Sequence, residues 1–333
     1  MLPGMQGPVR PILACLATAI AMLASPVAQA QAQAQAQFQL RMALADVGEL
    51  WMREALADPT RYVVVVVPGS GCETLASSAD RMFRNLVHAQ VWLLQKPNLM
   101  PAGSSASGCS AAFVQADDLA SWRLGASRLI RSAIPLAEPD LPWVLVGMSE
   151  GAELIPHLAS EMSRLALLVM VANAGLDPVH TAAMQARRMG QLGAWQRLMD
   201  QTRDWQPLDE RVLHGRSARY WHGLQTWSLL EPVLADERFL LQVWGGRDAL
   251  IPAAAYAEFA DQARRRPAGY CAVRFAQADH ELRVAVSTEA PAVDRVQTDR
   301  LQTIWRWIDT SARHPPQWSF DCASLQEQAS TAD

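Results

Sequence analysis

The sequence predicts an α/β protein with a mostly parallel sheet that helices cover on both faces. Short apolar runs rich in Val and Leu alternate along the chain with longer amphipathic stretches, which is the pattern of repeated strand–helix units. The run Tyr62–Val67 consists only of aromatic and β-branched residues, as in a strand that is buried on both faces. Several of these runs end in glycine-containing turns that carry Ser, Asp or His, so we expect chemistry at the carboxyl edge of the sheet.

The expected elements follow from hydrophobic periodicity. Residues 38–44 alternate apolar with polar or small side chains, which indicates a first, antiparallel strand. Further strands are expected near residues 62–67, 91–95, 142–147, 165–171, 239–244 and 271–276. Helices are expected between them, at residues 117–133, 151–163, 253–265 and 295–309. The chain shows no internal repeat.

The N-terminus has the pattern of a secretory signal peptide. A basic residue precedes an almost wholly apolar run, residues 12–24, and the tripeptide at 28–30 reads Ala-Gln-Ala. We therefore expect residues 1–30 to be a signal peptide that is removed by cleavage after Ala30. An uncleaved membrane anchor is the alternative, but the apolar run is short for a membrane span.

Beyond the signal peptide we expect one large domain. Residues 31–37 alternate glutamine and alanine and are expected to form a disordered leader, because they offer nothing to pack. Residues 38–333 are of ordinary length for a single α/β domain that carries an insertion.

Cysteine usage agrees with export. The chain has five cysteines, of which Cys15 lies in the signal peptide. The remaining even number indicates two disulfides in an oxidising compartment. Of the possible pairings we favour Cys72–Cys109, between loops that follow consecutive strands, and Cys271–Cys322, which would fasten the C-terminal tail to the last strand. A zinc site is the alternative, although no C-x-x-C spacing supports it.

Two classes of function have no support in the sequence. The formal net charge is −4 and Lys96 is the only lysine, and no basic run interleaves with aromatic residues. Nucleic-acid binding therefore has no support. Nucleotide binding has none either, because neither G-x-x-x-x-G-K-[ST] nor G-x-G-x-x-G follows a strand.

The most informative motif is Gly-Met-Ser-Glu-Gly at residues 147–151, directly after an apolar run. When G-x-S-x-G joins a strand to a helix, the turn is sharp and strained and exposes the hydroxyl of its central residue, here Ser149. The backbone N–H of Glu150 would lie at the start of the following helix, where it can stabilise an oxyanion. The pentapeptide by itself is also compatible with an ordinary Gly/Ser turn.

Three other expected strands end in residues that fit the same chemistry. The run Tyr62–Val67 leads into Pro-Gly-Ser-Gly, a small loop that can bring the backbone of Ser70 close to a ligand, although a plain tight turn would look the same. The last two strands lead to Asp248, in a Gly-Gly-Arg-Asp turn, and to His280. Serine, aspartate and histidine thus each follow a separate strand.

This order of residues and strands resembles the α/β-hydrolase fold family over roughly residues 60–310. The resemblance implies a catalytic triad in which Ser149 is the nucleophile, His280 the general base and then acid, and Asp248 the carboxylate that orients the imidazole. It also implies an oxyanion hole formed by backbone N–H groups.

The oxyanion hole implied by the resemblance uses the N–H groups of Ser70 and Glu150. Pro68 departs from the family pattern, because many members carry a histidine before the glycine of this loop. The position is not part of the triad, so the implied chemistry is unaffected.

Family members often insert a helical cap between the strands near 165–171 and 239–244, and residues 176–235 fit such a cap because they contain no convincing strand. We call residues 176–235 the cap. Its aromatic side chains either form a small core of the cap itself or line an apolar substrate pocket. They are Trp195, Trp205, Tyr220, Trp221 and Trp227, with His222 alongside.

Other residues compete for the implied roles. Asp177 follows an earlier strand, where some members of the family carry the acid, and is the alternative to Asp248. Asp279 is a poorer candidate, because the side chain of an immediate neighbour of His280 is expected to diverge from the imidazole. The side chains of Glu150 and Glu153 are expected to lie on a solvated helix face.

The sequence thus predicts a secreted or periplasmic serine hydrolase that cleaves a small-molecule ester, thioester or amide through an acyl-enzyme. A carboxylesterase is the leading expectation, and a peptidase, amidase or thioesterase of the same fold is the runner-up. A hydrolase-like binding protein without turnover is the non-enzyme alternative. No metal or organic cofactor, no nucleic-acid partner and no stable membrane anchor are implied.

Overall fold

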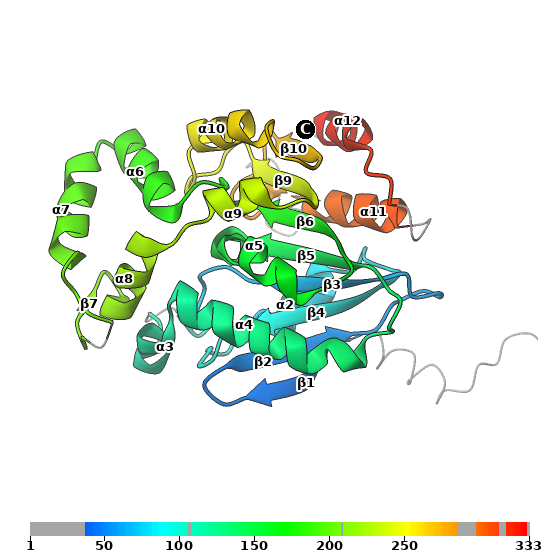
Figure 1. Cartoon of the computed structure of the whole chain (residues 1–333), viewed down its shortest axis with the longest axis horizontal. Helices are drawn as coiled ribbons and strands as arrows, with labels where there is room; N and C mark the ends of the chain where they lie inside the picture. Colours follow the sequence, from blue (N-terminus) through cyan, green and yellow to red (C-terminus); the bar gives the residue numbers. More distant parts are fainter. Residues whose placement is uncertain (1–36, 106–107, 208, 285–297, 313–317, 332–333) are drawn as a thin grey trace, which may run out of the picture.

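An eight-stranded, mostly parallel sheet forms the centre of the protein (Figure 1). The computed structural model describes residues 37–105, 108–207, 209–284, 298–312 and 318–331. The strands are β1 (Gln39–Leu44), β2 (Gly48–Arg53), β3 (Tyr62–Val67), β4 (Ala89–Gln95), β5 (Trp143–Met148), β6 (Leu165–Val171), β9 (Phe239–Gly245) and β10 (Tyr270–Phe275). Their order across the sheet is β1-β2-β4-β3-β5-β6-β9-β10.

The pairing of the strands confirms the predicted fold class. β1, β2 and β4 pair antiparallel, whereas the pairs from β4 to β10 are parallel. β3 is buried along its whole length, as its continuous apolar run predicts, and β4 is buried as well although it contains Gln90 and Gln95. β2 was not predicted, because its sequence Gly-Glu-Leu-Trp-Met-Arg mixes charged and apolar residues. The strand buries Arg53, whose guanidinium donates to the carbonyl oxygens of Phe83 (3.0 Å) and Leu86 (2.7 Å).

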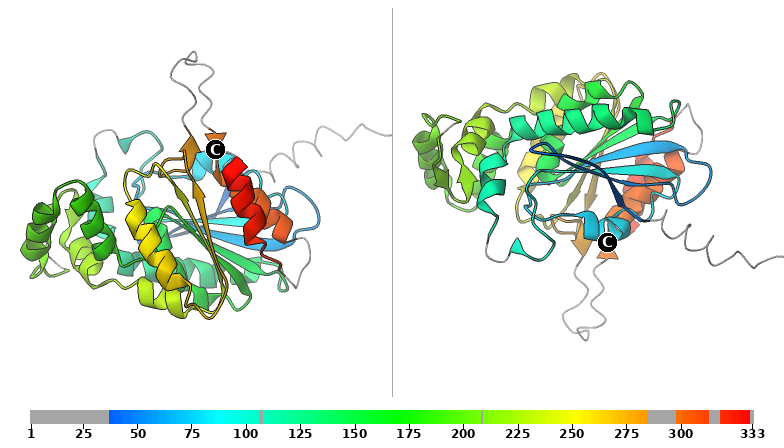
Figure 2. Two further views of the ribbon diagram at one scale, coloured as in Figure 1. Left: turned by 90° about the horizontal axis from the view of Figure 1, so that it is seen from above. Right: turned by 90° about the horizontal axis from the view of Figure 1, so that it is seen from below.

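Helices cover both faces of the sheet (Figure 2). Side chains of β3 alternate between the two cores, with Val63, Val65 and Val67 in one and Val64 and Val66 in the other. The first core packs against α4 (Leu119–Ala133), α5 (Ile155–Leu158), α9 (Leu230–Ala235) and α10 (Ala253–Ala263). The second packs against α2 (Ala76–Met82), α11 (Leu301–Ser311) and α12 (Cys322–Thr331).

Most of the cap, from α6 (Pro178–Arg188) to α8 (Ala218–Thr226), lies beyond one end of the sheet (Figure 1). After β6 the chain forms α6 and α7 (Leu192–Thr202). It then makes the short hairpin β7 (Val212–Leu213) and β8 (Arg216–Ser217), followed by α8, and returns through α9 to β9.

Two disulfides connect distant parts of the chain, and they are the two favoured by the sequence. Cys72 pairs with Cys109, and Cys271 pairs with Cys322. The zinc alternative is thereby excluded for these four cysteines.

The remaining elements are short. They include α3 (Ala111–Ala116) and the pair β11 (Arg283–Val284) and β12 (Thr298–Asp299). Within the described ranges, the longest apolar helices fall short of what a bilayer span requires.

Three expectations about elements need comment. The single helix predicted at 151–163 is wrong. The chain forms instead a 3₁₀ turn, η3 (Ser149–Glu153), then the four-residue α5, and then a second 3₁₀ turn, η4 (Ala159–Glu161). The break occurs because Pro156 cannot donate a helical hydrogen bond, so a new helix begins there. Of the helix predicted at 295–309, residues 295–297 lie outside the described residues, Thr298–Asp299 form β12 instead, and the helix α11 begins at Leu301. The predicted signal peptide and residues 31–36 of the predicted leader lie outside the described residues.

Candidate active site

Ser149 occupies a sharp turn between β5 and η3. Its φ angle is 51°, in the left-handed region, which costs a residue with a side chain roughly 1–2 kcal/mol. A Cβ atom on Gly147 would lie 2.4 Å from the Cα of Ala152, and one on Gly151 would lie 2.1 Å from the carbonyl oxygen of Val67. Both glycines of the motif are therefore required by the close approach of backbone, and the turn presents Ser149 at the carboxyl end of β5.

The structure brings together the three side chains that the sequence singled out. Asp248 follows β9 and His280 follows β10. Nε2 of His280 lies 3.0 Å from Oγ of Ser149, and Nδ1 lies 2.8 Å from Oδ2 of Asp248. Hydroxyl, imidazole and carboxylate thus form one continuous hydrogen-bonded chain.

The carboxylate of Asp248 is held by four hydrogen bonds. Its Oδ1 accepts the backbone N–H groups of Leu250 (2.8 Å) and Ile251 (2.9 Å). Its Oδ2 accepts a hydrogen bond from the hydroxyl of Tyr256 (3.0 Å) in addition to that from His280. Tyr256 was not predicted, since an aromatic residue on a helix ordinarily belongs to the core.

These contacts keep Asp248 ionised. Burial by itself would raise the pKa of this carboxyl, but the hydrogen bonds from His280 and from the backbone outweigh it and hold the pKa below its ordinary value. Burial, and then the charge of Asp248, raise the pKa of Tyr256, so its phenol stays a hydrogen-bond donor. An ionised carboxylate in this place can fix the imidazole tautomer and stabilise an imidazolium.

The competing aspartates have other partners. Oδ1 of Asp177 accepts the backbone N–H groups of Leu229 (2.7 Å) and Leu230 (3.0 Å), where α9 begins. Oδ1 of Asp279 accepts those of Glu281 and Arg283, both at 2.9 Å. Asp177 therefore holds the start of α9 and Asp279 holds its own loop, and neither carboxylate binds the imidazole of His280 in these contacts.

The loop after β3 runs directly beside Ser149. A Cβ atom on Gly69 would lie 3.1 Å from the Cβ and 3.7 Å from the Oγ of Ser149, so this loop can pass only with a glycine there. Ser70 comes next in the loop, and Glu150 is the residue after Ser149. The two candidate oxyanion donors therefore belong to segments that meet at the serine.

The expectation that Glu150 and Glu153 lie on a solvated helix face is wrong. The side chain of Glu150 is 12% exposed and pairs with Lys96, and Glu153 is 6% exposed. The reason is that residues 149–153 form a tight 3₁₀ turn packed between the sheet and the cap, and not the outer face of a long helix. The hydroxyl of Tyr220, on α8, donates to Glu150 from the cap side (3.1 Å).

A buried amide that the sequence did not single out supports the turn at Ser149. Nδ2 of Asn173, just after β6, donates to the carbonyl oxygen of Ser149 (3.1 Å) and to Oε1 of Glu153 (2.9 Å). Its Oδ1 accepts the N–H of Gly175 (2.7 Å). The available signal was a polar residue directly after a continuous apolar strand.

The cap aromatics belong to the core of the whole protein. Trp205 and Trp221 are buried in the same cluster as side chains of the sheet, so they do not form a separate core of the cap. The indole N–H of Trp227 donates to the carbonyl oxygen of Glu153 (3.2 Å), and its ring packs against His157 with 4.7 Å between ring centroids. These contacts attach the cap to η3 and α5, directly after Ser149.

A metal centre has no support in the described part of the chain, where no three His, Cys, Asp or Glu side chains gather in a way that could hold an ion. The arrangement around Ser149 is instead a hydroxyl, an imidazole and a carboxylate in hydrogen-bond contact.

Comparisons with known proteins identify structural neighbours only. No protein-family model and no curated protein matches the sequence. An acylaminoacyl peptidase from Pyrococcus horikoshii superimposes with a TM-score of 0.54 at 12% identity, over 87% of this chain and 44% of the peptidase chain. Est1E from Butyrivibrio proteoclasticus superimposes with a TM-score of 0.51 at 11% identity, over 82% of this chain and 96% of the Est1E chain. An arylesterase superimposes with a TM-score of 0.50 at 12% identity, over 85% of this chain and 90% of the arylesterase chain.

Proposed function

Because the chain has the α/β-hydrolase fold, we propose that it is a serine hydrolase that cleaves an ester or related acyl bond. The observation that carries the proposal is the hydrogen-bonded chain from Ser149 Oγ through His280 to Asp248, with contacts of 3.0 and 2.8 Å. Two neighbours, the acylaminoacyl peptidase and the arylesterase, act on acyl compounds by their descriptions, which supports the same class.

In the proposed acylation step, Oγ of Ser149 attacks the carbonyl carbon of the substrate while Nε2 of His280 takes its proton. The carbonyl π electrons move to the oxygen, and the backbone N–H groups of Ser70 and Glu150 stabilise the resulting oxyanion. The ionised carboxylate of Asp248 stabilises the imidazolium. The tetrahedral intermediate then collapses, the bond to the leaving group breaks, and His280 returns the proton to that group.

Deacylation repeats these steps with water as the nucleophile. His280 takes a proton from the water, the hydroxide attacks the acyl carbon, and Oγ of Ser149 leaves with the proton from Nε2. The products are a carboxylic acid and the free enzyme. These steps involve the triad, two N–H donors and water.

We also propose that the protein acts outside the cytoplasm, as a secreted or periplasmic enzyme. The two disulfides support this assignment, because such bonds persist in oxidising compartments. The N-terminal pattern of residues 1–30 is that of a cleaved signal peptide.

The test of the nucleophile is covalent labelling with a fluorophosphonate probe. Ser149→Ala should abolish labelling and lower the turnover of p-nitrophenyl esters by several orders of magnitude, because only the oxyanion hole and binding would remain. Ser311→Ala is the matched control, since its hydroxyl only donates to the carbonyl oxygen of Trp307 within α11. Full labelling of the Ser149→Ala variant would mean that another residue is the nucleophile.

The substrate class can be tested on the same preparation. A series of p-nitrophenyl esters of increasing chain length, assayed beside thioesters and aminoacyl amides, distinguishes a carboxylesterase from a thioesterase or peptidase. We expect the highest kcat/KM with esters. The description of one neighbour as an acylaminoacyl peptidase is the reason to include amides. Absence of labelling and of turnover in the parent would favour a binding protein.

A further inference from the structure

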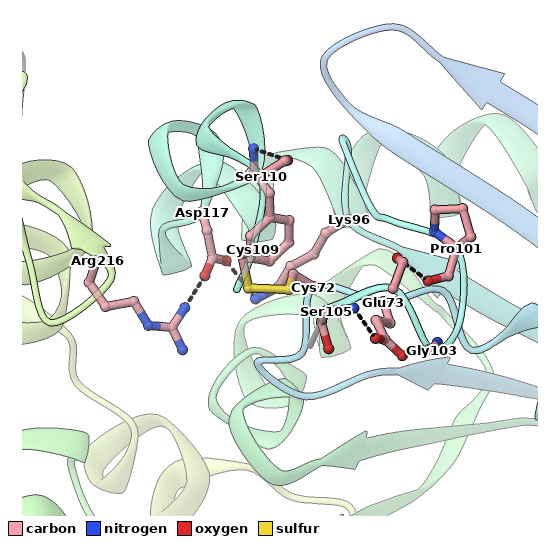
Figure 3. The surroundings of a disulfide bond; sticks show 12 residues. Cys72, Glu73, Lys96, Pro101, Gly103, Ser105, Cys109, Ser110, Asp117 and Arg216 are labelled. Carbon is pink, nitrogen blue, oxygen red and sulfur yellow. Dashed lines mark hydrogen bonds and ion pairs between the residues drawn. A yellow bond between two sulfur atoms is a disulfide. The ribbon is translucent and has the colours of Figure 1, made fainter. Parts of the chain in front are cut away.

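A cluster of buried and half-buried charged and polar side chains lies beside the turn at Ser149 and takes no part in the triad. Its members, which we call the Lys96 cluster, are Lys96, Asp117, Glu150, Arg216 and Tyr220. They come from four parts of the chain: the end of β4, the junction of α3 and α4, the turn after Ser149, and the cap. Figure 3 shows Lys96 close to the Cys72–Cys109 disulfide, with Arg216 directed at Asp117 from the cap.

The contacts within the Lys96 cluster form a closed network. Nζ of Lys96 lies 2.7 Å from Oδ1 of Asp117 and 2.7 Å from Oε2 of Glu150. The other oxygen of Asp117 accepts from Arg216, whose guanidinium also lies 4.4 Å from the ring centroid of Tyr220. The hydroxyl of Tyr220 donates to Oε1 of Glu150 at 3.1 Å.

Lys96, the only lysine of the chain, is 4% exposed. Burial of an ammonium group costs several kcal/mol unless carboxylates compensate it. Burial alone would lower the pKa of Lys96, but the charges of Glu150 and Asp117 outweigh it and raise the pKa. For Glu150 burial would raise the pKa, and the charges of Lys96 and Arg216 outweigh it and lower the pKa. The Lys96–Glu150 pair is therefore ionised at neutral pH.

This ion pair restrains the residue that follows the nucleophile. Both carboxylate oxygens of Glu150 are held, one by Lys96 and the other by Tyr220. Ser149 has a positive φ, so the turn is under strain and keeps its shape only because its surroundings hold it. The direction of the Glu150 N–H depends on that shape.

We propose that Lys96 is a positioning residue, which anchors the side chain of Glu150 and thereby aims the Glu150 backbone N–H at the oxyanion. The proposal rests on the proposed function, in which that N–H is one of the two oxyanion donors. A misplacement of a preorganised group by about 1 Å costs about 10²-fold in rate, so an anchor that does not touch the substrate can still control turnover.

The test replaces Lys96 by methionine, which has a similar length and no charge, and counts active sites by fluorophosphonate titration. We expect kcat per titrated site to fall by about 10²-fold, while KM changes by less than about threefold. A trifluoromethyl ketone, which forms an oxyanion on the serine, should lose affinity by a factor similar to the loss in kcat.

Two further variants are measured beside Lys96→Met. Arg164→Met is the control, because it removes an ion pair with Asp140 of comparable length, 2.8 Å, whose side chains are 47% and 89% exposed. It should leave kcat and inhibitor affinity unchanged. Tyr220→Phe removes only the second hydrogen bond to Glu150 and should lower kcat by about tenfold with KM preserved.

A merely structural role for Lys96 predicts a different result. The melting temperature and the fraction of titrated sites would fall, but kcat per site and inhibitor affinity would stay within twofold of the parent, and this outcome overturns the proposal. If Lys96→Met does not fold, Lys96→Met/Glu150→Gln, which leaves no unpaired charge from this pair, serves for the same measurement together with Tyr220→Phe. Activity that persists in Ser149→Ala would overturn the proposed function itself, whatever Lys96 does.

Discussion

At the scale of single residues, the candidate site depends on buried polar groups that hold one another in place. Asn173 binds the carbonyl oxygen of Ser149, and Nε2 of Gln242, in β9, donates to the carbonyl oxygens of Asn173 (3.0 Å) and Ala174 (2.9 Å). In a region of low dielectric such bonds are strong, and an unpaired partner would be costly. The turn at Ser149 is thus held by Asn173, and the side chain of Glu150 next to it is held by Lys96.

The identity of the acid can be tested by two matched substitutions. Asp248→Asn should lower turnover by about 10⁴-fold, because an amide no longer holds the imidazole tautomer that accepts the proton of Ser149. Asp177→Asn should be mild, because its Oδ1 can still accept the N–H groups of Leu229 and Leu230. Both variants are assayed with one ester after circular dichroism shows normal folding. The reverse ranking would assign the acid to the strand before the cap.

Glu153 leads to a prediction about stability and pH. Burial, opposed by the hydrogen bond from Asn173, raises the pKa of this carboxyl from 4.5 to about 8. Between these values the folded protein holds a proton that the unfolded chain has lost. Stability from this group is therefore complete at low pH and declines by about 1.4 kcal/mol per pH unit as pH rises through this window.

Glu153→Gln should remove this dependence. The variant keeps an oxygen for the hydrogen bond from Asn173 but carries no proton to lose. Urea unfolding at several pH values should show the variant gaining in stability over the parent from pH 5 to pH 8. Glu138→Gln, which replaces an exposed carboxyl, is the control and should show no such trend. A constant difference between Glu153→Gln and the parent would mean that Glu153 is ionised in the folded protein.

At the scale of elements, the two disulfides hold different parts of the fold. Cys72 and Cys109 join the loop after β3, which passes Ser149, to the loop after β4. The N–H of Met100 also donates to the carbonyl oxygen of Cys72 (2.8 Å), so the two loops are paired by backbone as well. Cys271 and Cys322 instead fasten α12 to β10, at the edge of the sheet.

Paired cysteine-to-serine variants should separate these roles. The closed loops span 37 and 51 residues, so chain entropy predicts similar losses of stability, about 2–4 kcal/mol each. Turnover should fall by about tenfold or more only in Cys72→Ser/Cys109→Ser, because that bridge holds the loop after β3, which carries the proposed oxyanion donor Ser70. Thermal melts and ester kinetics below the melting range provide the comparison. Equal turnover in the two variants would show that the β3 loop keeps its shape without the bridge.

At the scale of the whole molecule, the site is a product of the parallel sheet. β5, β6, β9 and β10 pair in parallel, so the segments that follow them leave the sheet at the same edge. Ser149, Asp248 and His280 meet there although three separate strands carry them. The cap contacts the same edge through hydrogen bonds that Tyr220 donates to Glu150 and Trp227 donates to Glu153.

Export of the whole chain is open to a direct measurement. Intact-mass analysis of protein expressed with its natural N-terminus and recovered from the medium or periplasm should give a chain that starts near Gln31. The mass should be lower by four hydrogens than that of the reduced chain, for two disulfides. Retention of residues 1–30 would contradict the signal peptide, and four free thiols in that sample would contradict the oxidising compartment.

The sequence by itself was sufficient for the sheet strands with continuous apolar runs, for the α/β class and for the two disulfides. These features follow from local patterns, such as the valines of β3, and from the rule that parallel strands have their carboxyl ends at the same edge of the sheet. The G-x-S-x-G motif was also informative as a local pattern, because each of its glycines is required where neighbouring backbone passes close by.

Only the tertiary structure decided which polar side chains meet. The chain by itself does not reveal that Asp177 holds the start of α9, that Glu153 is buried, or that Lys96 pairs with Glu150. The physical reason is that a charge on a short turn has no periodicity that reveals its partner. Its environment is set by elements far away in sequence, here β4 and the cap, and becomes defined only when the sheet has assembled.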